Sequence, residues 1–213
     1  MIFAIGNLKG GVGKTTIAVN LVSTLAEGQG NTLLIDAEGT AIAFTELRKR
    51  TLIASPYETR ALQGKAIYNQ RDKIKTNFTN TVIDIGGEDA TGSLRASLLI
   101  ADVVLIPVKP RSFDLWRTEE TFELVKEAQS IRGNSNSLRA VAVINEADPQ
   151  GQDNQATIDY LKSLPNLEVA PVLIGRRKAF SNAAAAGLTV LEYKADPKAT
   201  KEISTLIDFL ITI

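Results

Sequence analysis

A chain of 213 residues with 44% hydrophobic and 23% charged residues has the composition of one globular domain. Lysine plus arginine and aspartate plus glutamate both number 24, so any binding of nucleic acid must rest on a local basic patch. The absence of cysteine excludes disulfides and thiolate-held iron–sulfur clusters, and the absence of histidine excludes an imidazole base or metal ligand.

The sequence also bears on the location of the protein. Its first residues lack the basic start and the small-residue cleavage site of a signal peptide. No apolar run approaches the ~20 residues that a membrane-spanning helix needs. We therefore expect a soluble protein of the cytoplasm.

Short apolar runs alternate with helical patterns along the whole chain, which predicts an α/β fold. The predicted strands are residues 2–6, 32–36, 81–85, 103–108, 140–145 and 169–174, and the predicted helices are residues 15–27, 61–76, 91–100, 115–130, 154–163, 179–186 and 198–211. All-apolar strands separated by helices are typical of a parallel sheet covered on both faces. No linker divides the chain, so we expect residues 1–213 to form a single domain with a doubly wound, mostly parallel sheet.

The first predicted strand leads into a glycine-rich turn that opens a helix, which is the pattern of a phosphate-binding loop. Backbone N–H groups of such a loop close around phosphate oxygens, and the helix N-terminus adds the positive end of its dipole. We expect Lys14 to reach the terminal phosphates and the Thr15 hydroxyl to bind Mg²⁺. The residues expected to bind the nucleotide are Gly10, Gly11, Val12, Gly13, Lys14, Thr15 and Thr16.

Carboxylates follow two of the predicted strands. Asp84 ends an apolar strand, and this is the Walker B position that holds Mg²⁺ directly or through water. Asp36 and Glu38 close another strand, and their spacing in extended chain directs both side chains to one side. One of them could serve the outer shell of the metal, and the other could orient an attacking water. Each of these acids also has a structural interpretation, as a cap of a turn or a solvated loop residue.

The loop departs from the plain phosphate-binding pattern, because Leu8 stands where that pattern has glycine and Lys9 follows it. The string from Lys9 to Thr16 resembles the deviant Walker A motif of the ParA/MinD family of dimerising ATPases. The resemblance covers essentially the whole chain, through the acidic pair, Asp84, residues 106–110, Asn145 and the alanine-rich residues 181–187. It is greatest to small ParA-type ATPases that lack a helix-turn-helix domain and serve plasmid partition or carboxysome positioning.

The resemblance implies a P-loop NTPase fold, ATP and Mg²⁺ as cofactors, and a homodimer that sandwiches two ATP molecules. It implies that Lys9 crosses the twofold interface to the partner's ATP phosphates, acting in catalysis with Lys14 and Glu38. Asn145 would contact the adenine, or else cap its strand. The family usually has aspartate at the position of Glu38, and a displacement of ~1 Å can lower a rate about 100-fold. We therefore expect ATP binding and dimerisation with slow hydrolysis.

Basic residues gather late in the chain, and the resemblance implies that they bind DNA without sequence preference. The candidates are Arg176, Arg177, Lys178, Lys194, Lys198 and Lys201, and the alternative is a solvated charged surface. The family further implies association with the nucleoid and an adaptor protein that stimulates hydrolysis.

Two alternatives to this interpretation can be stated from the sequence. A membrane-bound relative would end in a basic amphipathic helix. Here the last helix carries an apolar stripe of Ile203, Leu206, Ile207, Leu210 and Ile211, so we expect it to pack on the core and expect no membrane partner. The second alternative is a metabolic P-loop enzyme, such as a small-molecule kinase or ligase of similar fold.

Overall fold

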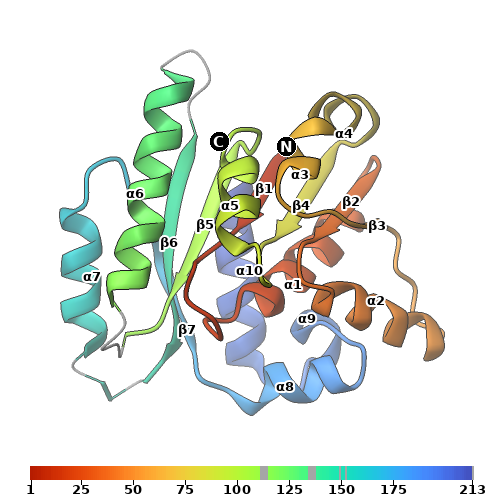
Figure 1. Ribbon diagram of the computed structural model, residues 1–213. Helices are drawn as coiled ribbons and strands as arrows, with labels where there is room; N and C mark the ends of the chain where they lie inside the picture. The colour runs from red at the N-terminus through yellow and green to blue at the C-terminus, as the bar shows by residue number, and fades with distance from the viewer. Residues whose placement is uncertain (111–114, 134–137, 149, 152, 213) are drawn as a thin grey trace.

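The computed structural model describes residues 1–110, 115–133, 138–148, 150–151 and 153–212, and the strands in this part form one sheet (Figure 1). They are β1 (Ile2–Ile5), β2 (Thr32–Asp36), β3 (Glu58–Ala61), β4 (Asn80–Asp84), β5 (Val103–Val108), β6 (Arg139–Ala147) and β7 (Glu168–Gly175). Their order is β3-β2-β4-β1-β5-β6-β7, and every pairing is parallel. The predicted doubly wound parallel sheet is confirmed.

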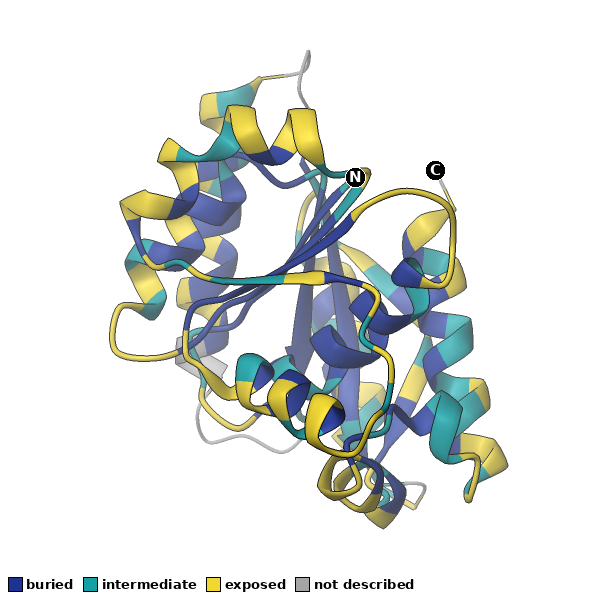
Figure 2. Ribbon diagram, turned by 90° about the vertical axis from the view of Figure 1, so that its right-hand side faces the viewer, coloured by how far each residue is buried: buried dark blue, intermediate teal, exposed yellow. Residues whose placement is uncertain are grey.

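Helices cover both faces of this sheet (Figures 1 and 2). They are α1 (Lys14–Ala26), α2 (Thr40–Arg50), α3 (Lys65–Asn69), α4 (Arg71–Asn77), α5 (Ala90–Leu98), α6 (Leu115–Arg132), α7 (Asp153–Ser163), α8 (Lys178–Ala185), α9 (Val190–Tyr193) and α10 (Pro197–Ile211). Side chains of α3 to α7 join one buried apolar cluster, and those of α1, α2, α8, α9 and α10 join the other.

The central strands are apolar throughout because both of their faces are buried. In β1, Ile2 and Ala4 belong to the core under α3 to α7, whereas Phe3 and Ile5 belong to the core on the opposite face. A strand buried on both sides therefore appears as an uninterrupted apolar run, which is the signal on which the sequence prediction relied.

The structure differs from the prediction on the side of the sheet that ends in β3. This edge strand has a partner on one side only, and its sequence Glu-Thr-Arg-Ala is polar and partly exposed, so it lacks the apolar signal of the other strands. The helix predicted for residues 61–76 is wrong at its start, because Ala61 ends β3. It is also divided into α3 and α4 at Gln70. Helix α2 was not predicted.

The C-terminal helix packs on the core, as expected. Ile203, Leu206, Ile207 and Leu210 of α10 are buried in the cluster that includes α1. Ile211 departs from the predicted stripe, since 42% of its surface is exposed. Within the described residues, the structure contains no helix with the length and apolarity that crossing a membrane requires.

A buried arginine joins α2 to the segment around α9. The side chain of Arg48 is almost fully buried and forms two 2.7 Å hydrogen bonds with the carboxylate of Glu192. It also donates to the backbone carbonyls of Gly187 and Ala54. Glu192 in turn accepts the backbone N–H of Thr189, which completes a capping box at the start of α9. The C-terminal end of α2 is therefore fixed to the rest of the domain.

Candidate functional site

The candidate site lies at the carboxyl edge of the sheet, where β1, β2 and β4 end side by side. Ile5 of β1 is in register with Asp84 of β4, and Asp84 is in register with Asp36 of β2. The glycine loop leaves β1 at this edge and enters α1. In open parallel sheets, ligands bind beyond the carboxyl ends of the strands. The predicted phosphate loop and both predicted acidic positions therefore meet at the expected place.

The glycine loop ends at the N-terminus of α1. Gly13 caps the helix with a φ of 89°, a left-handed conformation that only glycine adopts without strain. Its carbonyl accepts the N–H of Ile17 at 3.1 Å, which is the first hydrogen bond of the helix. Free N–H groups at the start of α1 consequently face the loop, and these groups attract an anion.

Lys14 lies inside the loop. Its side chain is 9% exposed, and its Nζ atom donates to the carbonyl of Lys9 over 3.2 Å. Burial lowers the pKa of Lys14, and the carboxylates of Asp84 and Glu38 act in the opposite direction. The ammonium group is thus held between a backbone carbonyl and two acids, where an anionic phosphate would be a better partner than the neutral carbonyl.

Asp84 is the buried acid of the site. Its Oδ2 atom accepts the Thr15 hydroxyl at 2.7 Å, and its Oδ1 atom is buried without a hydrogen-bond partner. Burial raises the pKa of Asp84 to about 7, although the hydrogen bond from Thr15 opposes this shift. A carboxylate and a hydroxyl are oxygen ligands that suit Mg²⁺, and the unpartnered Oδ1 atom gives the pair capacity for a cation.

Asp36, the other buried acid, is fully engaged with the backbone. Its two oxygens accept the N–H groups of Glu38, Gly39 and Ile42 at 2.7 to 2.8 Å. Asp36 therefore holds the turn between β2 and α2 and caps the start of α2. This contact favours the structural interpretation of Asp36 over its prediction as a metal ligand, which stays untested.

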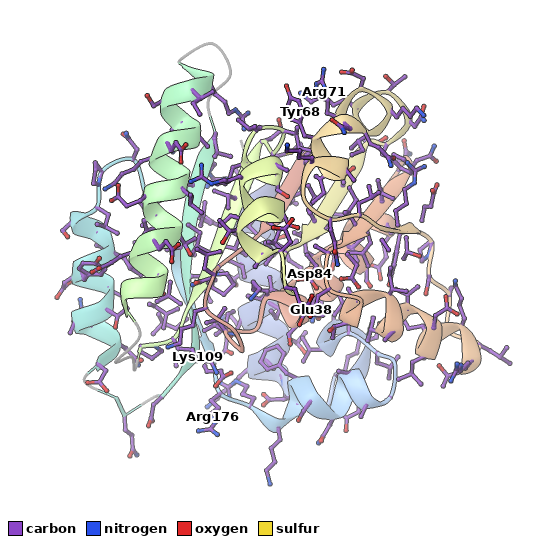
Figure 3. The ribbon with its side chains drawn as sticks, viewed as in Figure 1. Glu38, Tyr68, Arg71, Asp84, Lys109 and Arg176 are labelled. Carbon is purple, nitrogen blue, oxygen red and sulfur yellow. The ribbon has the colours of Figure 1, made fainter. Side chains whose placement is uncertain are left out.

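Glu38 is exposed at the opening of the site. It lies close to Asp84 in Figure 3, and its carboxylate packs so closely against the α-carbon of Gly86 that a β-carbon there would clash with it. Its negative charge raises the pKa of both Asp84 and Lys14. Of the three acids predicted for the site, Glu38 is the accessible one, since Asp36 and Asp84 are buried.

Asn145 lies under the loop at the end of β6. Its Nδ2 atom donates to the carbonyl of Val12 at 2.7 Å, and the side chain is only 7% exposed. It also fills the space beside Gly13 that a β-carbon would need. The observed contact is with the backbone of the phosphate loop, and the predicted contact with adenine remains a prediction.

The sequence prediction missed Asn7, which connects the start of the loop to β5 and α6. The amide donates to the carbonyl of Pro107 at 2.9 Å and accepts the N–H of Lys9 at 2.8 Å. Nearby, the hydroxyl of Thr121 on α6 accepts the N–H of Leu8 at 3.0 Å. A polar residue directly after an apolar strand is a signal of such a contact, but its partners cannot be read from the sequence.

The late basic residues differ in how far their charge is compensated by acids. Arg176, Lys178, Lys194, Lys198 and Lys201 are exposed. By contrast, Arg177 forms a two-pronged ion pair with Glu202, and its Nη1 atom is 3.7 Å from Asp196. Since these acids compensate its charge, Arg177 is a poor candidate for a contact with DNA.

The family of the chain follows from a domain comparison. A model of the CobQ/CobB/MinD/ParA nucleotide binding domain matches residues 3–190. The match spans most of the chain, so the protein belongs to this family of nucleotide-binding domains. The family expected from the glycine loop is thereby confirmed.

Two curated relatives are each called maintenance of carboxysome distribution protein A. The protein from Halothiobacillus neapolitanus is 26% identical over 211 residues, which cover 98% of this chain and 95% of the relative. The protein from Gloeobacter kilaueensis is 28% identical over 198 residues, which cover 91% of this chain and 85% of the relative.

Solved structures share the fold. Apo McdA from Cyanothece matches with a TM-score of 0.77 at 18% identity, over 98% of both chains. MinD from Aquifex aeolicus matches with a TM-score of 0.76 at 18% identity, over 100% of this chain and 97% of that one. A putative plasmid partition protein from Borrelia burgdorferi bound to AMPPNP has a TM-score of 0.73 at 16% identity, over 100% and 99%.

The first prediction concerns the stability of the nucleotide-free protein. Between about pH 4 and pH 7 the folded chain keeps a proton on Asp84 that the unfolded chain has released, so stability falls as pH rises through this window. Asp84→Asn removes this decline, and we expect it to stabilise the protein by about 1–3 kcal/mol at pH 8 and less at pH 5. Urea unfolding followed by circular dichroism measures the effect. Equal pH profiles for Asp84→Asn and the exposed control Asp208→Asn would contradict it.

The second prediction separates the two roles of Asn145. Asn145→Ala leaves the buried carbonyl of Val12 without its donor, so we expect the loop to bind ADP and GDP about tenfold more weakly. Isothermal titration calorimetry measures both affinities, with the exposed Asn182→Ala as control. A loss confined to ADP would instead indicate a contact with adenine and would refute the role in the loop.

Proposed function

We propose that this chain is a ParA-type ATPase that dimerises around ATP and Mg²⁺, hydrolyses ATP slowly and positions a cargo such as a carboxysome. Binding of ATP and Mg²⁺ is supported by the side chains of Lys14, Thr15 and Asp84, which lie together at the glycine loop. The positioning part is supported by the family and by two relatives named for carboxysome distribution.

The proposed cofactor site fits the atoms present. Bound Mg²⁺ supplies positive charge that neutralises the phosphates as they react. The Thr15 hydroxyl and the unpartnered Oδ1 atom of Asp84 would hold it. The Nζ atom of Lys14 would exchange the carbonyl of Lys9 for a phosphate oxygen.

The exposed acid is the proposed catalytic group. We assign to Glu38 the role of orienting the attacking water, because its carboxylate is accessible and its charge acts on Lys14 and Asp84. Asp36 would keep the backbone of this turn in place through its three N–H contacts. Lys9, partly exposed at the rim of the loop, would reach the phosphates held by a second copy of the chain.

The proposal includes partners and one competing function. In the ATP-bound state the dimer would bind DNA without sequence preference and associate with the nucleoid, and an adaptor protein would stimulate hydrolysis. A metabolic P-loop enzyme, acting as a small-molecule kinase or ligase, is the second candidate because the matching family model also spans CobQ and CobB. The names of the two relatives favour the first function.

A third prediction tests the nucleotide-dependent dimer. We expect AMP-PNP with Mg²⁺ to convert the 23.0 kDa monomer into a dimer, as measured by size-exclusion chromatography with light scattering, and ADP to leave it monomeric. Lys9→Ala should still bind AMP-PNP without dimerising, whereas Lys14→Ala should lose binding itself. A wild-type monomer in AMP-PNP, or turnover that requires a small phosphate acceptor, would favour the metabolic enzyme.

A fourth prediction concerns the length of the acidic side chain. Glu38→Asp should accelerate ATP hydrolysis by about 10- to 100-fold and shorten the lifetime of the dimer, because the carboxylate moves by about 1 Å. Phosphate release and dimer dissociation measure the two effects. Glu46→Asp, the same change at an exposed position of α2, is the control. Equal rates for Glu38→Asp and the wild type would reject the role of side-chain length.

A further inference from the structure

Helices α3 and α4 present a basic surface that the sequence prediction did not single out. We call Lys65, Tyr68, Arg71, Lys73 and Lys75 the α3–α4 basic surface. The three lysines are exposed and form no ion pair with any described residue. Arg71 lies 3.6 Å from the highly exposed Asp72, a contact that solvent weakens. The positive charge of this surface is therefore largely uncompensated.

An aromatic ring lies within these cations. Tyr68 is 38% exposed, and the guanidinium of Arg71 stacks over its ring at 4.4 Å from the centroid. The same guanidinium donates to the carbonyl of Tyr68. Figure 3 shows both side chains at the outer end of the molecule, directed away from the core. The stack holds a fixed positive charge beside an exposed phenol.

The balance of charge is more one-sided here than in the late basic cluster. Helices α3 and α4 contain four basic residues and one acidic residue, and Arg60, which precedes them, is already paired with Glu58. Residues 176–208 contain six basic residues and four acidic residues, and two of these acids pair with Arg177. A polyanion would therefore meet less like-charge repulsion on α3 and α4 than on the C-terminal segment.

We infer that the α3–α4 basic surface binds the phosphate backbone of duplex DNA. This inference rests on the DNA binding included in the proposed function and assigns it to a part of the chain. Lysines and arginines bind DNA phosphates whatever the base sequence of the DNA. A tyrosine hydroxyl can also donate a hydrogen bond to a phosphate oxygen.

The composition of the surface favours nucleic acid over an acidic protein segment. Protein interfaces take most of their binding energy from apolar or aromatic anchors in desolvated pockets. Of the large exposed hydrophobic side chains in the described part of the chain, only Tyr68 lies on α3 or α4. Several exposed cations around one tyrosine, without a cluster of exposed apolar side chains, fit a phosphate-binding surface better than a protein interface.

The surface is separate from the nucleotide site yet connected to it. Tyr68 and Arg71 lie at the end of the molecule opposite to Arg176, with Glu38 and Asp84 between them (Figure 3). DNA at α3 and α4 therefore leaves the phosphate loop open. The segment before α3 reaches the site, because Gln63 donates to the carbonyl of Ala37 at 2.6 Å.

The test, our fifth prediction, compares two triple variants of the full chain. The first is Lys65→Gln/Lys73→Gln/Lys75→Gln, and the matched control is Arg176→Gln/Lys198→Gln/Lys201→Gln. Binding to a 40-base-pair duplex of arbitrary sequence is measured by fluorescence anisotropy with AMP-PNP and Mg²⁺ at several salt concentrations. We expect the first variant to bind at least tenfold more weakly than wild type at low salt, with a log–log salt slope smaller by about 2–3.

The possible outcomes are distinguishable. Unchanged affinity and slope in the first variant, with wild-type DNA binding intact, overturn this inference alone. If the wild type binds no duplex in any nucleotide state, the DNA part of the proposed function fails, while dimerisation is still judged by light scattering. The surface docks a protein, contrary to the inference, if wild type binds poly-L-glutamate more tightly than DNA and the first variant loses only that binding. AMP-PNP affinity and circular dichroism, expected to be unchanged, verify that the variants fold.

Discussion

Two carboxylates buried side by side at the end of the sheet are the constraint on which this site depends. Asp36 and Asp84 are in register on neighbouring strands, where low dielectric strengthens their repulsion. Three backbone N–H groups stabilise the charge of Asp36, whereas Asp84 receives one hydroxyl and keeps an unpartnered oxygen. The nearby ammonium of Lys14 and the hydroxyl of Thr15 compensate part of this deficit. The same imbalance would favour binding of the cation that we propose to accompany the phosphates.

The sequence predicts the central sheet well because each central strand has to be apolar on both sides. Residues 103–108 and 32–36 could hardly be anything other than buried strands. β3 carries no such requirement, since it packs at the edge and owes its strand conformation to pairing with β2. The start of α2 is likewise held by the hydrogen bond that Asp36 accepts from Ile42. The end of α2 is held by the ion pair of Arg48 with Glu192, more than 140 positions further along the chain. Helix propensity, read from the sequence, predicts neither of these two contacts.

The phosphate loop is the part of the site that sequence predicts best, because its residues are contiguous and their chemistry requires that order. Partners that come from distant segments are not predictable in the same way. Asn145 fits the pattern of a strand-end residue, and only the folded chain brings it to Val12. Arg177 looks like one more cation in a basic run until α10 brings Glu202 against it. Charge counted along the chain is therefore a poor guide to charge available at the surface.

The ion pair between Arg48 and Glu192 has a mechanical consequence for Glu38. Because the C-terminal end of α2 is anchored to the segment around α9, this helix cannot rotate freely as a rigid body when the conformation of the phosphate loop changes. Any rearrangement of the acid-bearing turn must be absorbed at its near end, where Gly39 has a φ of 102° and tolerates large rotations. Movement of Glu38 would therefore be confined to the short turn before α2, where Asp36 accepts the N–H groups of Glu38 and Gly39.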